Sequence, residues 1–267
     1  FIMIFYSAIQ PIYLLLPLLG LIIGVLGSML GGGGGFFFLP VLLLLLHVPS
    51  QTAVITSLVA TLPICIAGTF SHYQKNNINF HMAILFALSG IAGAFIGAEI
   101  TSKINSDQLK IAFGIYSVLI AVYIGFSTWQ KKKNESQGKG AGKSSGLSKI
   151  AKGSFFGFFA GIITGTFGTS GTAPVLAGLL SMRMPFKIVI GTSLLIVLVN
   201  TIFAISAHFL INKIDFTLVI FLTAGSAIGA LIGPRLLMKV KIDSNENKLR
   251  YWYAAAMFAI GFLLIIG

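Results

Sequence analysis

Apolar runs of about twenty residues recur along almost the whole chain and are separated by short polar breaks. A helix that crosses the hydrocarbon core of a bilayer needs roughly 20 such residues. Of the 267 residues, 56% are hydrophobic and 9% are charged, and this balance lies far from that of a soluble globular domain. The strict alternation of apolar and polar residues that is typical of a membrane β-barrel is absent. The sequence therefore predicts an all-α polytopic membrane protein.

We expect about ten transmembrane segments, and we expect the first to be a true span because no basic stretch precedes it as in a cleaved signal peptide. The polar stretch 131–153 is rich in Gly, Ser and Lys, as flexible linkers are. This linker divides the chain into a first transmembrane repeat, 1–130, and a second, 154–267. The expected segments are 8–30, 36–46, 51–73, 80–102, 107–130, 154–167, 173–182, 186–210, 216–238 and 248–267.

The two halves resemble each other when they are shifted by 136 residues. Between positions 49 and 97 the shift brings about 15 identical residues into register over 49 aligned positions without a gap. The matches include polar and helix-breaking residues, which are more informative than matched leucines. Such internal similarity is typical of transporters built from two repeats. The most telling pairs are Pro49 with Pro185, Thr56-Ser57-Leu58 with Thr192-Ser193-Leu194, His72 with His208, Asn76 with Asn212, and Gly93 and Gly97 with Gly229 and Gly233.

The distribution of lysine and arginine predicts the orientation of the repeats. With five crossings in each half and the linker in the cytoplasm, 15 basic residues lie inside and only Lys103, Lys110 and Lys213 lie outside. Four crossings in each half would instead place 9 basic residues on each side. Since cytoplasmic loops carry the excess of positive charge, the 5+5 inverted repeat is favoured. We expect a cell inner (plasma) membrane protein with both termini outside.

Five consecutive glycines, Gly31 to Gly35, interrupt an apolar stretch that is too long for one span. The second half has the stretch GTFGTSGTAPVL at the corresponding place, and its Pro174-Val175-Leu176 matches Pro40-Val41-Leu42. Non-helical backbone at membrane depth must face protein or a watered cavity, and paired breaks in two repeats indicate a transporter's binding site. The N–H groups of such turns, together with a helix N-terminus, can bind an anion.

Other glycines are expected to allow close helix packing instead, because they recur at a spacing of four residues as small-xxx-small contacts do. These are Gly20 with Gly24, Gly157 with Gly161, Gly93 with Gly97, and Gly229 with Gly233.

Hydroxyl side chains that recur in both halves are further candidates for the site. Thr56 and Ser57, and their counterparts Thr192 and Ser193, could donate to an anion or bond back to their own helix. Additional polar candidates inside the spans are Asn200, Gln51 and Thr61.

Several ionisable residues are candidates for gating or coupling. His72 and His208 lie at opposite membrane faces in the predicted topology, so a shared metal site is not expected; each is an interfacial histidine or a protonation switch. Glu99 precedes Lys103 by four residues, so a surface ion pair is the simplest explanation, with proton coupling or gating as the alternative. The polar Asn200 is a further candidate for gating or coupling. The remaining candidates are Arg183 and Lys187, which either attract an anion to a cytoplasmic vestibule or only mark topology.

The sequence offers little for enzymatic chemistry. The linker stretch GKGAGKSS lacks the first glycine of a P-loop, since Gln137 stands there, and no apolar strand precedes it. No zinc-type spacing of Cys and His is present, and we expect no cofactor and no metal. The single cysteine, Cys65, is expected to be a packing residue. The net charge of +12 comes from residues in loops, so we expect lipid as the partner and not nucleic acid.

The chain resembles the TauE/SafE sulfite exporter family, a group of 4-toluene-sulfonate-uptake-type membrane transporters. The resemblance lies in GVLGSMLGGGGGFFFLPVLLL, its copy GIITGTFGTSGTAPVLAGLL, and the segments AVITSL and VIGTSL. The second copy differs by having Thr169, Ser170 and Thr172 among its glycines. The resemblance implies secondary transport, commonly export, of small sulfur-containing anions such as sulfite, sulfoacetate, other organosulfonates or thiosulfate.

These observations together predict a binding site for a small anion between the two broken segments, with access that alternates as the repeats rock. Proton coupling and a homodimer remain open. A passive anion channel, a transporter of another small carboxylate and a non-transporting membrane subunit are the alternatives. The expected substrate-binding residues are Gly31, Gly32, Gly33, Gly34, Gly35, Thr56, Ser57, Gly168, Thr169, Ser170, Gly171, Thr172, Thr192 and Ser193.

Overall fold

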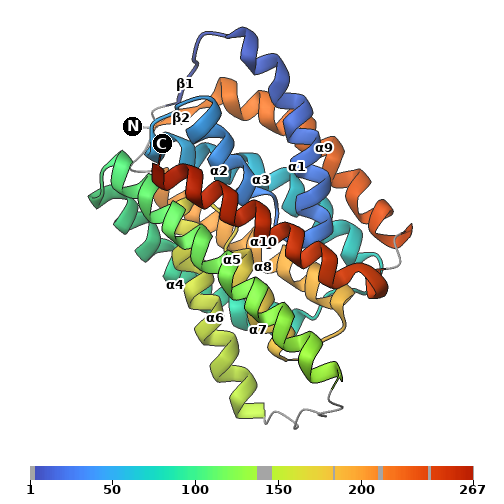
Figure 1. Ribbon diagram of the computed structural model, residues 1–267. Helices are drawn as coiled ribbons and strands as arrows, with labels where there is room; N and C mark the ends of the chain where they lie inside the picture. Colours follow the sequence, from blue (N-terminus) through green and yellow to red (C-terminus); the bar gives the residue numbers. More distant parts are fainter. Residues whose placement is uncertain (1–3, 137–145, 183, 210–212, 240–241, 267) are drawn as a thin grey trace.

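The computed structural model describes residues 4–136, 146–182, 184–209, 213–239 and 242–266 as a bundle of helices (Figure 1). The elements are β1 (Ile4–Phe5), η1 (Pro11–Leu15), α1 (Leu16–Leu30), α2 (Gly35–Pro40), η2 (Val41–Leu45), α3 (Ser50–Tyr73), α4 (Phe80–Lys103), α5 (Ser106–Ser136), α6 (Gly146–Phe167), α7 (Thr172–Ser181), α8 (Phe186–His208), β2 (Ile214–Asp215), α9 (Phe216–Lys239) and α10 (Ile242–Ile266).

Within the described residues, seven helices are long and apolar enough to cross a membrane. Three further apolar helices are shorter, at Gly35–Leu45, Thr172–Ser181 and Ala254–Ile266. The all-helical membrane architecture is confirmed, whereas ten full spans are not, because these three segments are too short to count as spans by length. Two of the three are the segments that follow the glycine-rich breaks.

Local sequence signals explain where the long helices begin. Pro49 and Pro185 directly precede α3 and α8 with nearly the same extended backbone, because proline pre-sets φ and cannot donate to an intrahelical hydrogen bond. Asn79 caps α4, and its Oδ1 accepts from the Met82 N–H at 3.1 Å. Asp215 caps α9 in the same way, with its Oδ1 3.0 Å from the Thr217 N–H.

The helices on either side of the expected linker are longer than predicted. α5 continues through residues 131–136, and α6 already begins at Gly146. Residues 137–145 lie outside the described part of the chain. The flexible segment that we expected over 131–153 is therefore helical at both of its ends.

Helices of the first half pack mainly against helices of the second half. α1 packs on α9, and α6 packs on α4, so the first long helix of each half lies against the third long helix of the other. α3 packs against α8 and α9, α4 also contacts α8, and α5 lies beside α10. The neighbouring pairs are visible in Figure 1, where α5 is green and α10 is red.

The interfaces between α1 and α9 and between α4 and α6 are built on bare glycine backbone. A Cβ at Gly24 would be 2.9 Å from the Cα of Ser226, and one at Gly97 would be 2.7 Å from the N atom of Thr166. Gly229 and Gly161 similarly touch the backbone of the facing helix. The predicted packing role of the glycines spaced by four residues is confirmed, since only a residue without a side chain permits this approach.

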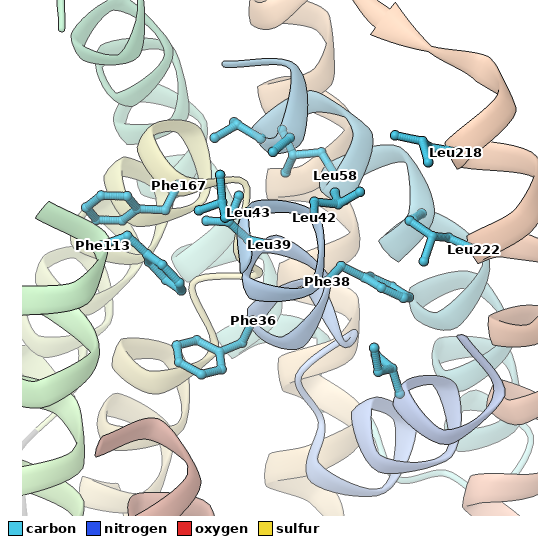
Figure 2. Packing of buried hydrophobic residues seen from close by; sticks show 14 of the residues in the cluster. Phe36, Phe38, Leu39, Leu42, Leu43, Leu58, Phe113, Phe167, Leu218 and Leu222 are labelled. Carbon is cyan, nitrogen blue, oxygen red and sulfur yellow. The ribbon is translucent and has the colours of Figure 1, made fainter. Parts of the chain in front are cut away.

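The short α2 helix lies in the apolar core. Phe36, Phe38 and Leu39 are buried, and Figure 2 shows them among side chains from α3, α5, α6 and α9. Phe36 packs against Phe113 of α5 with ring centroids 5.4 Å apart. This packing fixes the position of the glycine-rich turn that precedes α2. The other labelled members of the cluster are Leu42, Leu43, Leu58, Phe167, Leu218 and Leu222.

Candidate functional site

Two glycine-rich turns lead into the short helices. The first turn, residues 31–34, joins α1 to α2, and the second, residues 168–171, joins α6 to α7. In the first turn Gly31, Gly33 and Gly34 have positive φ angles of 73°, 63° and 79°. In the second turn Gly168 and Gly171 have φ angles of 62° and 51°. Left-handed backbone is readily adopted only by glycine, which explains why both turns carry it.

The first turn lies against the middle of the two central helices. A Cβ at Gly33 would be 2.9 Å from Cγ2 of Thr61 and 3.3 Å from Cγ1 of Val197. Thr61 stands halfway along the 24-residue α3, and Val197 stands halfway along the 23-residue α8. The turn therefore reaches the mid-depth of the helices that are long enough to span a membrane.

The two turns meet each other. A Cβ at Gly35 would be 3.1 Å both from the carbonyl oxygen of Gly168 and from the N atom of Ser170. The hydroxyls of Ser170 and Thr172 donate to the carbonyl oxygen of Gly32, the latter at 3.1 Å. Stretches that are almost 140 residues apart in the sequence are thus joined by hydrogen bonds.

A serine from each central helix binds the turn of the opposite half. Ser57 Oγ on α3 lies 3.0 Å from the carbonyl oxygen of Gly168 and 3.1 Å from that of Gly35. Ser193 Oγ on α8 donates to the carbonyl oxygen of Gly31 at 2.8 Å. Both serines are fully buried. The structure therefore brings Ser57 and Ser193 to the turns, as the sequence predicts.

Some backbone N–H groups at this junction have no acceptor among the described residues. In the described part of the chain, the N–H groups of Gly34, Gly35, Thr169 and Ser170 donate no hydrogen bond. All four residues are buried, and buried backbone donors are almost always paired in proteins. No lysine or arginine among the described side chains is buried. The junction therefore offers neutral donors to an anion without a fixed positive charge.

The neighbouring threonines behave differently from the serines. Thr192 Oγ1 accepts the N–H of Asn79 at 2.9 Å, so this hydroxyl serves the turn before α4 and not the glycine turns. Thr56 Oγ1 and Thr169 Oγ1 are buried without a hydrogen-bond partner among the described residues.

Thr61 and Cys65 border the first turn directly. Thr61 Oγ1 would be 2.9 Å from a Cβ at Gly35, and Cys65 Sγ would be 2.6 Å from a Cβ at Gly33. Our interpretation of Cys65 as a packing residue did not place it at the turn. The sequence feature that could have predicted this position is the spacing of four residues between Thr61 and Cys65, which puts both side chains on one face of α3.

The two histidines have different surroundings. His208 is buried, and its Nε2 is hydrogen-bonded to the carbonyl oxygen of Gly165 near the end of α6. His72 is buried beside Gly191 of α8, and its ring nitrogens have no hydrogen-bond partner among the described residues.

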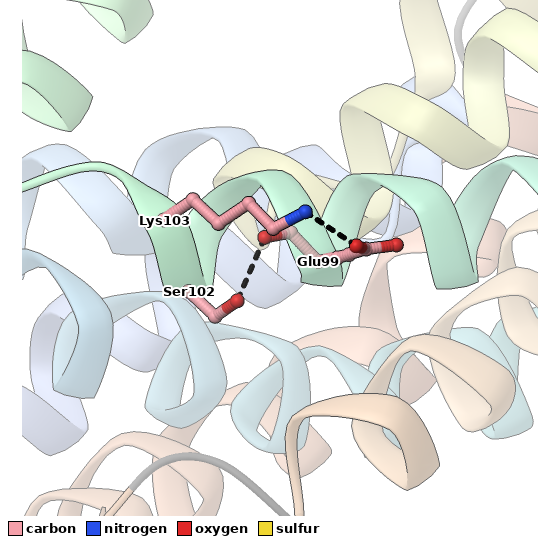
Figure 3. Close-up of polar contacts among 3 residues, drawn as sticks. All are labelled: Glu99, Ser102 and Lys103. Atoms are coloured by element: carbon pink, nitrogen blue, oxygen red, sulfur yellow. Dashed lines mark hydrogen bonds and ion pairs between the residues drawn. The ribbon is translucent and has the colours of Figure 1, made fainter.

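The charged candidates that the structure describes are at the surface. Glu99 and Lys103 form an ion pair (Figure 3). Glu99 Oε1 lies 2.6 Å from Lys103 Nζ, and the two side chains are 64% and 70% exposed. The predicted helix-surface pair is confirmed. Lys187 is exposed near the start of α8, and Arg183 lies outside the described residues. Gln51 is bonded to Ile104 and Ser106 at the beginning of α3, far along that helix from Thr61.

The short helices that follow the two breaks begin at a spacing that differs from the 136-residue shift. α2 begins at Gly35 and α7 begins at Thr172, a shift of 137 residues. Pro40 is the last residue of α2, whereas Pro174 is the third residue of α7. Pro40-Val41-Leu42 and Pro174-Val175-Leu176 match in sequence, but the two prolines stand at different distances from the starts of their helices.

Comparison with known proteins identifies relatives over nearly the whole chain. The family model described as Sulfite exporter TauE/SafE matches residues 16–264. The probable membrane transporter protein YdhB of Bacillus subtilis is 28% identical over 239 residues, which cover 87% of this chain and 93% of that protein. A probable membrane transporter protein of Xylella fastidiosa is 29% identical over 253 residues, covering 91% and 92%. No solved structure matches the chain.

Proposed function

Because the chain belongs to the TauE/SafE family of membrane transporters, we propose that it is a secondary transporter that exports small sulfur-containing anions. The proposed substrates are sulfite, sulfoacetate and other organosulfonates. The observation that carries the proposal is the convergence of two glycine-rich turns with unused N–H donors at mid-depth of α3 and α8. Within Gly31–Gly35 and residues 168–172, the unused N–H groups of Gly34, Gly35, Thr169 and Ser170 would hold the anion's oxygens. The hydroxyls of Ser57 and Ser193 would lie beside them.

The exchanged helix pairs support a 5+5 inverted repeat for this transporter. In such a repeat α1 corresponds to α6, α4 to α9 and α3 to α8. The observed pairs α1 with α9 and α6 with α4 are then one contact made twice, as a two-fold relation requires. The hydrogen bond from Ser57 to the carbonyl oxygen of Gly168 and the bond from Ser193 to the carbonyl oxygen of Gly31 are likewise equivalent under this two-fold relation.

The hydrogen bonds at the junction support alternating access in preference to a passive channel. The hydroxyls of Ser57, Ser170, Thr172 and Ser193 all donate to carbonyl oxygens of the turns and so hold the turns together. An anion that accepts hydrogen bonds from these hydroxyls must break their bonds to the carbonyl oxygens, and the turns then separate. A substrate that opens its own site is expected to show saturable transport.

The test is counterflow of radiolabelled sulfite and sulfoacetate in proteoliposomes that contain the purified protein, with and without an imposed pH gradient. We expect saturable exchange, and a response to the gradient would add proton coupling. Flux that neither saturates nor depends on trans substrate would instead indicate an anion channel. No flux of either anion above empty liposomes would refute the proposed function.

Gly32→Ala is the variant that probes the junction. Gly32 lacks the positive φ of its neighbours, and its Cβ would be 3.2 Å from Thr172 Oγ1, so a methyl group presses on the junction with little backbone strain. Valine at Gly33 or Gly34 is a poorer probe, because both have positive φ and meet side chains within 2.9 Å. We expect Gly32→Ala to lower the exchange rate at least tenfold. Gly125→Ala, with no atom within 4 Å of its Cβ, is the control and should match the wild type.

A further inference from the structure

Asn200 is a fully buried amide with no hydrogen-bond partner among the described residues. It lies on α8 between the middle of the helix and its end at His208. The adjacent Thr201 is also fully buried, and its hydroxyl is likewise unpartnered in the described part of the chain. A buried amide without a partner is unfavourable, so two such groups side by side call for an explanation.

The facing helix leaves room for the Asn200 amide. Gly90 of α4 lies directly against it, and a Cβ there would overlap Oδ1 and come within 2.7 Å of Nδ2. An asparagine inside a membrane bundle often joins two helices by a hydrogen bond. Asn200 lies against the backbone of Gly90, yet neither Oδ1 nor Nδ2 forms a hydrogen bond among the described atoms. The absence of a side chain at Gly90 leaves space for the amide, but the amide forms no hydrogen bond there among the described residues.

Asn200 and Thr201 lie one helical turn from the glycine junction. Val197, whose Cγ1 would be 3.3 Å from a Cβ at Gly33, precedes them by three and four residues. Residues at that spacing share a face of a helix. The side of α8 that touches the first turn therefore continues into these two polar side chains.

The corresponding face of α3 is less polar. The 136-residue shift matches Asn200 with Ile64 and Thr201 with Cys65. Ile64 Cδ1 would be 2.9 Å from a Cβ at Gly34, and Cys65 Sγ 2.6 Å from one at Gly33, so both positions border a glycine turn. At this pair of positions the amide and the hydroxyl therefore occur on α8 and not on α3, so a structural role shared by both halves does not explain them.

We propose that Asn200 and Thr201 bind the transported anion, donating hydrogen bonds to its oxygens when the two turns separate. The amide supplies two N–H donors and the threonine supplies one O–H donor. All three are neutral, in keeping with a junction that holds no buried lysine or arginine among its described side chains. This assignment rests on the proposed function, and it makes anion binding unequal between the two halves.

The experiment compares Asn200→Leu and Thr201→Val with wild type by the KM of sulfite and sulfoacetate counterflow and by thermal unfolding in detergent. Each variant removes an unpartnered polar group and keeps nearly the same shape. We expect the melting temperature to stay the same or rise, while KM rises about tenfold or more because a hydrogen bond to a charged ligand is lost. Thr128→Val is the matched control: Thr128 is buried but already donates to Ile124 of its own helix at 2.7 Å, so its KM should stay within about twofold.

A wild-type KM in Asn200→Leu and Thr201→Val would overturn the assignment and leave the proposed function intact. If Asn200→Leu does not fold, Thr201→Val decides alone. Wild-type protein that neither transports these anions nor is stabilised by them against heat would overturn the proposed function and the assignment with it.

Discussion

Four of the five consecutive glycines have a local structural explanation. Gly31, Gly33 and Gly34 adopt positive φ angles, whereas at Gly35 a side chain would press on the carbonyl oxygen of Gly168. The second turn keeps glycine at its two positive-φ positions and has Thr169 and Ser170 between them, where φ is ordinary. The less regular copy is therefore a turn with fewer left-handed residues, and the freed positions carry hydroxyls.

A prediction at the residue scale concerns the only described ion pair. Glu99 and Lys103 are largely exposed and join positions on the same helix, and exposed pairs contribute little to stability. We expect Glu99→Gln to leave the melting temperature, the transport rate and the response to a pH gradient unchanged. The same proteoliposome assay provides the measurement, with Lys103→Gln as the partner control. A loss of the pH response in Glu99→Gln alone would show that this carboxylate carries protons.

At the scale of the helices, the sequence predicts most boundaries closely. The predicted segments 51–73 and 80–102 differ from α3 and α4 by a single residue at one end, because Pro49 and Asn79 mark where the chain can start a helix. The extensions of α5 and α6 were missed because we interpreted lysine as a linker residue, although lysine is also a good helix former.

Side-chain direction at the site could not be predicted from the sequence. Thr56 and Ser57 are neighbours, so their side chains point about 100° apart around α3, and the sequence does not tell which of them reaches a turn. The structure selects Ser57, while the counterpart of Thr56 on α8, Thr192, bonds to Asn79. Both helices are apolar on all sides, so neither has a single hydrophobic stripe that would predict which side chains face the turns.

The prediction at the scale of helices tests the glycine interface between α4 and α6. A Cβ at Gly161 would overlap the backbone of Gly90, which cannot move aside as a flexible side chain would. We expect Gly161→Ala to destabilise the protein by about 1–3 kcal/mol, measured as a lower melting temperature in detergent. Gly125→Ala should melt like wild type. An unchanged melting temperature for Gly161→Ala would show that these helices are not closely packed in the membrane.

At the scale of the whole molecule, the inverted topology predicts which lysines face which side. In a Cys65→Ala background, which removes the single cysteine, cysteine can replace the exposed Lys75, Lys187, Lys103 or Lys213. A membrane-impermeant maleimide applied to intact cells or spheroplasts should label the replacements at 103 and 213. Those at 75 and 187 should react only after permeabilisation. Labelling of 75 and 103 from the same side would contradict an odd number of crossings between them.

The exchange of helix partners imposes an order on assembly at the ribosome. Gly93 of α4 meets Phe158, only 65 positions later, whereas Gly20 of α1 meets Leu222, 202 positions later. At about 5–20 residues per second, α1 waits on the order of 10–40 s for its partner. During that interval its glycine face is covered only by lipid or by a helper protein. A chain that stops before α9 would leave that face exposed, a mark by which the cell's quality control could recognise an unfinished transporter.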